Sequence, residues 1–416
     1  MMFISLKKRP TTGLIKTLGL ALLLWGGIGS ITLAQSAPKE ITELIKRGSV
    51  LLLDETGKPL VSYRANEAYA PASVIKVLTA AVLIEELGPH YRPKTRFFIN
   101  AQGDLGIQGF GDPYLVSEEI ALVAKELKDL NMNQFKSVRL DSSMFQAPAK
   151  APGTTNTLNP YDAINGALAV NFNSLFLKRN KDGQVVSAEK ATPLTPLSAK
   201  KGLILKPGIT DRLNLTQDPK EGLLYTGELF MAVFAREGLT LEGPISYGPL
   251  GVEFKEILTH ENSRELPEIL AGLLKFSNNY IANQMFLVLG AERSGWPAAE
   301  EKSLKVFGQS VAKKFAPKPG EFALVEASGI ARENRVTANL LGQILVTFAP
   351  HYELLHPHKR YKNIYLKSGT LTGVHNYIGY IKTDRGLRPF VILLEQPRNA
   401  RENLLAELLQ LSQARP

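Results

Sequence analysis

The stretch PASVIKVLTAAVLIEELGP, at residues 71–89, carries the strongest structural signal in the sequence. Its apolar residues predict a helix that is buried on every side, and Gly88 followed by Pro89 ends that helix. Ser73 stands in the first turn, where backbone N–H groups lack partners and stabilise a developing negative charge. Lys76 follows one turn later on the same face. Because burial disfavours its charge, this lysine is suited to accept a proton from the serine.

Two more polar motifs interrupt apolar stretches further along the chain: SNN at residues 277–279 and KSG at residues 367–369. The pattern S-x-x-K recurs several times, but S-x-N and K-[ST]-G each occur once. The Ser277 hydroxyl can pass a proton toward a leaving amine. The Asn279 amide can orient Lys76 and the substrate backbone. The three motifs, in this order, predict nucleophilic catalysis by a serine.

The KSG motif contributes a positive charge and a strand edge. Lys367 lies near the end of an apolar strand, and with the Ser368 hydroxyl it could hold a terminal carboxylate. Gly369 has no side chain, so a substrate can approach the edge of the strand. The backbone N–H groups of Ser73 and Thr370 are the expected oxyanion hole.

Strands from the two ends of the chain are expected to form one sheet. We expect five of them, at residues 49–54, 60–63, 361–370, 375–382 and 388–395. The first two form a hairpin. Helices from both ends, including a last one at about residues 400–411, would cover this five-stranded antiparallel sheet. The fold class predicted is therefore α+β.

The middle of the chain has a different pattern. From about residue 93 to residue 255, short strand-like runs alternate with turns that contain Gly and Pro, and two helical stretches interrupt them. We expect an inserted domain of mixed α and β structure at 93–255. The catalytic domain would then comprise residues 35–92 and 256–416.

The first 34 residues resemble an export signal. A basic start precedes an apolar run at residues 18–24, and Thr32-Leu33-Ala34 offers small residues for cleavage. We therefore expect a signal peptide at 1–34 and a protein secreted across the cytoplasmic membrane, into the periplasm or cell-wall space. The alternative is an uncleaved anchor, because residues 17–34 carry no charge.

Composition and missing motifs exclude several other functions. The chain has no cysteine, which excludes disulfides, thiolate metal sites and a cysteine nucleophile. Its net charge of +10 is not gathered into a basic run or a basic-aromatic stripe, so no nucleic acid partner is expected. Neither G-x-S-x-G nor H-E-x-x-H occurs, and His351, His356 and His358 are expected in a surface loop. We expect neither a metal nor a cofactor, and we leave peripheral association with the membrane open.

The three motifs match the S-x-x-K, S-x-N and K-[ST]-G set of penicillin-binding proteins and serine β-lactamases. Nearly the whole mature chain resembles the D-alanyl-D-alanine carboxypeptidase/endopeptidase family, the class C penicillin-binding proteins of peptidase family S13. The further matching stretches are residues 109–115, 140–145, 327–334 and 367–374. This resemblance implies a transpeptidase-like catalytic domain with an insertion between the first two motifs. It also implies acyl-enzyme chemistry on peptidoglycan stem peptides, with β-lactam antibiotics as covalent inhibitors.

The resemblance also implies a pocket for the third residue of the stem peptide. The matching positions are Asp141 for an ammonium group, Phe145 for the methylene stem and Arg332 for a carboxylate. Two features depart from the family pattern. Ser368 stands where Thr is usual, and the stretch at about 150–215 is short for a separate third domain.

Two other functions remain as alternatives. A serine β-lactamase shares all three motif types, but the E-x-x-L-N segment of the class A arrangement does not occur here. A non-catalytic wall-binding protein of the same fold should have lost Ser73, Lys76 or Asn279, and all three are present. The motifs do not decide between carboxypeptidase and endopeptidase action, because both begin with acylation by the same D-Ala carbonyl.

Overall fold

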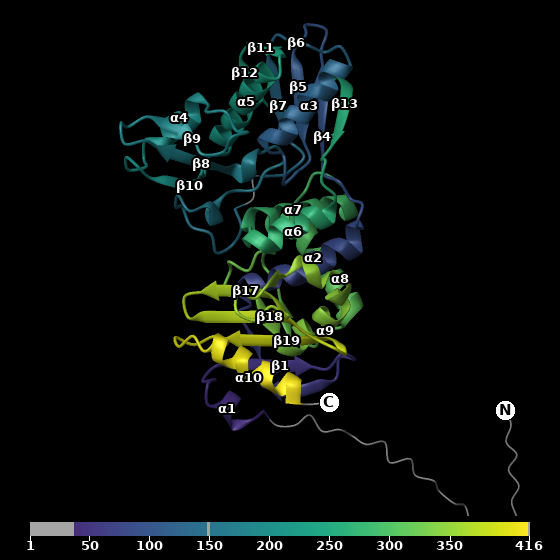
Figure 1. Ribbon diagram of the computed structural model, residues 1–416. Coiled ribbons are helices and arrows are strands. Elements are labelled where there is room, and N and C mark those ends of the chain that lie inside the picture. Colours follow the sequence, from purple (N-terminus) through teal and green to yellow (C-terminus); the bar gives the residue numbers. More distant parts are fainter. Residues whose placement is uncertain (1–36, 148–149, 415–416) are drawn as a thin grey trace, which may run out of the picture. The chain divides into compact units, whose positions relative to one another are not determined.

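A computed structural model describes residues 37–147 and 150–414 of the chain (Figure 1). The signal peptide expected at 1–34, and the alternative anchor at 17–34, lie outside the described residues. Within the described part, no helix is both long and apolar enough to cross a membrane.

The largest sheet joins the two ends of the chain. Its strand order is β16-β17-β18-β19-β1-β2, and all neighbours are antiparallel. The bounds are β1 Gly48–Leu53, β2 Pro59–Tyr63, β16 His356–Pro357, β17 Ile364–Leu371, β18 Val374–Thr383 and β19 Gly386–Leu394. Five of these are the strands predicted from sequence, but the sheet has six. The additional strand β16 lies in the region expected to be a loop, after the 3-10 helix η4 (Ala349–Leu354).

Helices cover both faces of this sheet. Successive residues of its strands point to opposite sides, and apolar side chains on both sides need a covering layer. Leu51, Ile378 and Val391 belong to a core shared with one group of helices: α2 (Ile75–Leu87), α6 (Leu266–Phe276), α7 (Asn279–Ser294), α8 (Glu300–Phe315) and α9 (Ala338–Phe348). Leu52 and Ile392 pack on the other face against α1 (Lys39–Thr42) and α10 (Arg401–Ala414). In Figure 1, α10 lies in yellow across that face. The fold is α+β, as predicted.

The inserted segment forms a second sheet, with order β12-β7-β5-β4-β13. Its strands are β4 Lys94–Ile99, β5 Leu105–Gly109, β7 Val138–Asp141, β12 Ile245–Tyr247 and β13 Lys255–Glu261, and α3 (Ser117–Asp129) and α5 (Pro219–Arg236) share their apolar core. Because β13 pairs with β4 along its length, the boundary expected between residues 255 and 256 falls inside this sheet. The second boundary must therefore follow β13. The division into two domains stays a prediction, with this correction.

A smaller sheet occupies the stretch that looked short for a third domain. It has the order β10-β8-β9, with β8 Ser174–Arg179, β9 Val185–Ser187, β10 Thr210–Asn214 and the helix α4 (Pro196–Gly202). Leu175, Leu213 and Leu197 belong to the same apolar cluster as the larger inserted sheet. The small sheet therefore shares a core with its neighbour. The remaining short elements are β3 Ala68–Tyr69, β6 Gln134–Phe135, β11 Thr240–Leu241, β14 Phe322–Ala323, β15 Arg335–Thr337, η1 Ala72–Val74, η2 Pro160–Asp162 and η3 Asn171–Asn173.

Candidate active site

Lys76 is the centre of the candidate site and is fully buried in α2. Its Nζ atom lies 3.0 Å from Ser73 Oγ, 2.8 Å from Asn279 Oδ1 and 2.5 Å from the Ser328 carbonyl oxygen. Burial lowers the pKa of Lys76 well below its usual value, and the positive charge of Lys367 lowers it further, against a smaller opposing effect of Glu326. The first two motifs thus meet at one nitrogen atom.

Ser73 lies in the 3-10 turn η1 that leads into α2, rather than in the α-helix itself. The preceding residue, Ala72, has a φ of 47°, which an L-residue adopts only when its surroundings enforce it. Asn376 of β18 supplies part of that enforcement. Its Nδ2 donates to the carbonyl oxygens of Ala70 (2.9 Å) and Pro71 (2.8 Å). The turn that presents the nucleophile is therefore fastened to the sheet.

Gly369 explains how β17 can lie so close to this turn. A Cβ atom at residue 369 would lie 2.7 Å from the Pro71 carbonyl oxygen and 3.1 Å from the Ser73 backbone nitrogen. A side chain here would push the strand away from the nucleophile. Substrate access was the role expected for the missing side chain; in the structure, its absence permits contact between the strand and the Ser73 turn.

Lys367 and Ser277 form the second hydrogen-bonded group. Lys367 Nζ donates to Ser277 Oγ and to the Ser368 carbonyl oxygen, each at 2.9 Å. Burial lowers the pKa of Lys367 to about 8. Ser277 ends α6 with a left-handed φ of 52°, and the Asn278 side chain then caps α7 by accepting from the backbone N–H of Ile281. The break between the two helices thus sets the position of the SNN motif.

The five residues predicted to be catalytic form two hydrogen-bonded groups, Ser73–Lys76–Asn279 and Lys367–Ser277, and the three predicted substrate-binding residues of β17 follow Lys367 directly. Ser368 is half-buried, while Thr370 is exposed at the end of the strand. Thr370 Oγ1 accepts a hydrogen bond of 2.8 Å from Arg401 Nη1. The Arg401 guanidinium lies 4.5 Å from the centre of the Tyr377 ring. Among the described residues, it forms no ion pair with a carboxylate.

Sequence reasoning missed Arg401, which starts α10 more than thirty residues after the KSG motif. It also missed Glu326. The buried Glu326 carboxylate accepts hydrogen bonds from the backbone N–H groups of Ser328 (2.7 Å), Gly329 (2.7 Å) and Ala331 (3.2 Å). It thereby orders the loop whose Ser328 carbonyl contacts Lys76. The one available signal was its position directly before the matching stretch 327–334.

In the described part of the chain, no hydrogen bond, ion pair or ring contact joins Asp141, Phe145 and Arg332, the three residues of the predicted pocket. Asp141 is buried, and its carboxylate accepts from Gln108 Nε2 (2.8 Å), from the Ser143 N–H (2.8 Å) and from the Leu250 N–H (3.1 Å). Phe145 is buried and stacks on Trp296.

Arg332 is exposed, and its Nη2 donates to the Thr372 carbonyl oxygen at 2.6 Å. No ion pair joins it to Asp141 in the described part of the chain. The pocket stays a prediction, and the oxygen atoms of Asp141 already have protein donors.

This fold is the penicillin-binding transpeptidase-like fold. The chain superposes on penicillin-binding protein 4 of Haemophilus influenzae with a TM-score of 0.71, over 90% of this chain and 98% of that one, at 18% identity. The family model for the D-Ala-D-Ala carboxypeptidase 3 (S13) family matches residues 42–201 and 207–359. The chain belongs to this family, which confirms the resemblance inferred from the motifs.

Two further proteins are similar to this chain. The D-alanyl-D-alanine carboxypeptidase of Actinomadura sp. (strain R39) is 26% identical over 351 residues, which cover 71% of this chain and 64% of that relative. The chain thus spans less than two thirds of the relative's length. A predatory peptidoglycan endopeptidase of Bdellovibrio bacteriovorus has a TM-score of 0.53 at 14% identity, over 88% of this chain and 90% of that one. At these identities, both structural matches show the fold alone.

Proposed function

We propose that the protein is a serine D-Ala-D-Ala carboxypeptidase that acts on peptidoglycan stem peptides through an acyl-enzyme on Ser73. The observation that carries this proposal is the set of contacts at Lys76 Nζ. A neutral amine has two N–H bonds and one lone pair. The Asn279 and Ser328 oxygen atoms accept hydrogen bonds from the two N–H groups. The lone pair of Lys76 Nζ is then left to accept a hydrogen bond from the Ser73 hydroxyl.

The geometry supports the following acylation step. Ser73 Oγ transfers its proton to Lys76 Nζ and attacks the carbonyl carbon of the penultimate D-Ala, and the amide C–N bond breaks to give an ester. The N–H groups of Ser73 and Thr370 stabilise the oxyanion. The departing D-Ala amine receives a proton through Ser277, which Lys367 contacts. Water then hydrolyses the ester and frees Ser73.

We assign recognition of the substrate's carboxylate to the positively charged groups at and beside β17. Lys367 with the Ser368 hydroxyl forms one part of this site. Arg401 forms another, because its guanidinium is held by Thr370 and Tyr377 and has no carboxylate partner among the described residues. A guanidinium can bind a carboxylate through two parallel hydrogen bonds. Lys367, Ser368 and Thr370 belong to strand β17, and Arg401 contacts that strand through Thr370.

DD-endopeptidase action on peptide cross-links is proposed as a second activity of the same site. Its acylation step is the same, and only the leaving amine differs. The fold match to a protein described as a peptidoglycan endopeptidase favours this second activity.

We also propose that the protein acts outside the cytoplasmic membrane. The basic and apolar pattern of residues 1–34 supports export, and the family acts on the cell wall. Peptidoglycan peptides would be the substrates, and β-lactams would be covalent inhibitors. One structure of the Haemophilus influenzae protein holds a β-lactam.

Labelling with penicillin tests the proposal. Peptide mapping should place the adduct on Ser73, and Ser73→Ala should abolish labelling. The matched control is Ser310→Ala, because Ser310 and Lys313 have the same S-x-x-K spacing on α8. Label on another serine would overturn the assignment.

The lifetime of the adduct separates two activities. An adduct that lasts seconds or less would indicate a β-lactamase instead. Products from cross-linked and uncross-linked muropeptides, identified by mass, would separate endopeptidase from carboxypeptidase action.

A further inference from the structure

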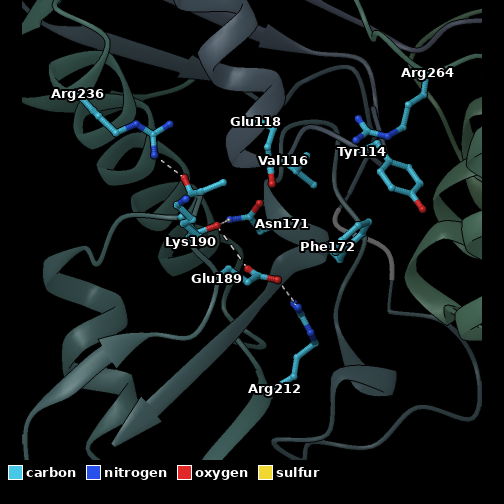
Figure 2. A pocket seen from close by; sticks show the side chains of 12 residues that line it. Tyr114, Val116, Glu118, Asn171, Phe172, Glu189, Lys190, Arg212, Arg236 and Arg264 are labelled. Carbon is cyan, nitrogen blue, oxygen red and sulfur yellow. Dashed lines mark hydrogen bonds and ion pairs between the residues drawn. The ribbon is translucent and has the colours of Figure 1, made fainter. Parts of the chain in front are cut away.

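Two neighbouring cavities lie along the inserted segment, and one of them reaches the SNN motif. The first has a volume of about 850 Å³, and Asn278 and Asn279 form part of its wall. The second has a volume of about 690 Å³. Both are lined by Tyr114, Phe172 and Arg212, so the two cavities share a wall. Figure 2 shows these three residues in the lining of the second cavity. Their sizes are in the range of small-molecule sites. A path of cavities therefore leads from the catalytic motif along the inserted segment.

The shared wall is built on strained backbone. Asn171, Phe172 and Asn173 have φ values of 51°, 61° and 51°, and none of them is a glycine. Left-handed conformations of this kind cost of the order of 1 kcal/mol each and persist only where the surroundings enforce them. The buried amide of Asn171 accepts from the Ser117 N–H (3.1 Å), and that of Asn173 donates to the Ile164 carbonyl (3.1 Å). Strain of this kind, held by buried hydrogen bonds, is typical of functional sites.

The strained turn positions an aromatic wall. The Phe172 ring packs edge-to-face against Tyr114, with 5.2 Å between ring centres, and against Tyr280, at 6.4 Å. Tyr280 follows Asn279 directly, so this wall begins at the catalytic motif. The aromatic cluster is thus fixed relative to the candidate active site.

The first cavity also collects exposed apolar side chains. Phe276 is 67% exposed, Tyr161 54% and Leu158 46%, and all three line it. Phe276 is the residue immediately before Ser277. Apolar surface gathered in a cavity beside a catalytic motif indicates a ligand-binding surface. The negative face of an aromatic ring attracts the polarised C–H groups on the face of a sugar ring.

The charges around the second cavity balance, which favours a neutral ligand: its three arginines have carboxylate partners, and the two other charged lining residues, Lys190 and Glu118, are opposite in sign. Each of its three arginines already has a carboxylate partner: Arg212 pairs with Glu189, Arg236 with Glu237 and Arg264 with Glu119. Figure 2 shows Arg212 and Glu189 pointing toward each other. An arginine that is already paired with a carboxylate does not need an anionic ligand to balance its charge. The pair still offers fixed hydrogen-bond donors and acceptors to hydroxyl and amide groups. Such a lining, next to aromatic rings, suits an N-acetylated sugar.

We propose that these two cavities bind the sugar-bearing end of the peptidoglycan substrate, while its D-Ala-D-Ala end lies at Ser73. This inference rests on the proposed function and adds a substrate preference: the enzyme should favour stem peptides that are still attached to glycan over free peptides. Phe276 and Tyr161 would stack on sugar rings, and the ion pairs around Arg212 would bind their hydroxyl groups.

The experiment compares a disaccharide-linked pentapeptide with the same pentapeptide after an amidase has removed the sugar. The readout is the ratio of kcat/KM for the two substrates. Tyr161→Ala should lower this ratio by about 3- to 10-fold, because one aromatic contact is lost. The control is Tyr247→Ala, since Tyr247 on β12 is also exposed (39%) but lines neither cavity. It should leave the ratio unchanged.

Binding provides a second readout that needs no turnover. In a Ser73→Ala background, calorimetry should show weaker binding of the disaccharide-linked peptide when Tyr161 is replaced. The inference would be overturned if Tyr161→Ala left the ratio unchanged, whether kcat/KM stayed the same or fell equally for both substrates. It would also be overturned if kcat/KM fell for the free peptide alone, because the cavities would then hold peptide. Failure of the proposed function would appear differently, as absence of penicillin label on Ser73 in the parent enzyme.

Discussion

Lys76 Nζ and Asn279 Oδ1 lie 2.8 Å apart although 203 positions separate the two residues in the chain. This contact joins α2, which follows the turn that carries the nucleophile, to α7, which begins at Asn279. It occupies one N–H bond of the lysine, and the Ser328 carbonyl occupies another. The amine is thus oriented with its remaining position toward Ser73.

Lys76→Arg should be nearly inactive in acylation. A guanidinium cannot lose its proton near neutral pH, so the variant cannot accept the Ser73 proton. The measurement is the second-order rate of penicillin labelling at pH 7, with circular dichroism to show that the variant is folded. Acylation within about tenfold of the parent rate would contradict the general-base role.

The burial of Lys76 should also appear in the pH dependence of stability. Its pKa is lowered in the folded state, whereas it is near its ordinary value of about 10.4 in the unfolded chain. Between these values the unfolded state binds more protons, so the free energy of unfolding rises with pH. Relative to Lys76→Met, the parent should gain up to about 1.4 kcal/mol per pH unit. Urea unfolding of both proteins at pH 7, 8 and 9 measures this difference. A constant difference would mean that Lys76 stays charged when the protein folds.

Lys367 should set the alkaline limit of activity. Its pKa is about 8 because it is buried, so it loses its charge as the pH rises through that value. A neutral amine holds a carboxylate less well, and kcat/KM should therefore fall above pH 8. Lys367→Arg keeps a charge at all these pH values, so any activity it retains should lack this decline. A decline of the same shape in both proteins would assign it to another group.

Arg401→Gln should weaken the binding of substrates with a free terminal carboxylate. The loss of a charged hydrogen bond is worth about 1.5–3 kcal/mol, so kcat/KM should fall by about 10-fold or more. The effect should lie mainly in KM, because the carboxylate is bound in both the ground state and the transition state. A peptide with an amidated C-terminus should show a much smaller loss. Arg398→Gln, an exposed site three residues away, is the control. Equal losses with both substrates would indicate a structural role for Arg401.

The sequence was sufficient to predict five strands of the main sheet and to predict that the three motifs lie close together. β1 and β17–β19 are apolar and bounded by turn residues, so their pattern is clear without tertiary information. Ser73, Lys76, Ser277, Asn279 and Lys367 could be found because their spacing is local within each motif. The family resemblance then implied that the motifs meet.

Other features depend on contacts that have no local signature. β16 has two residues and includes a proline, which is too short for any periodicity. β13 was assigned to the wrong side of a boundary, because its partner β4 lies about 160 residues earlier in the chain. Arg401 hydrogen-bonds to strand β17, and Glu326 hydrogen-bonds to the backbone of the loop that follows it. In sequence, an isolated Arg or Glu usually indicates only a solvated surface. Such residues become visible only when the chain is folded.

The pairing of β1 with β19, with Gly48 opposite Leu394, also determines when the enzyme can first exist during synthesis. Ser73 leaves the ribosome early, but the strand that supports its turn is made about 300 residues later. Contacts of such high contact order form slowly, because a long loop must close before they contribute. A chain that stops before β17 would contain the nucleophile and its base but neither Lys367 nor the expected oxyanion-hole strand. Chains that stop before β17 should therefore be unable to carry out the proposed acylation.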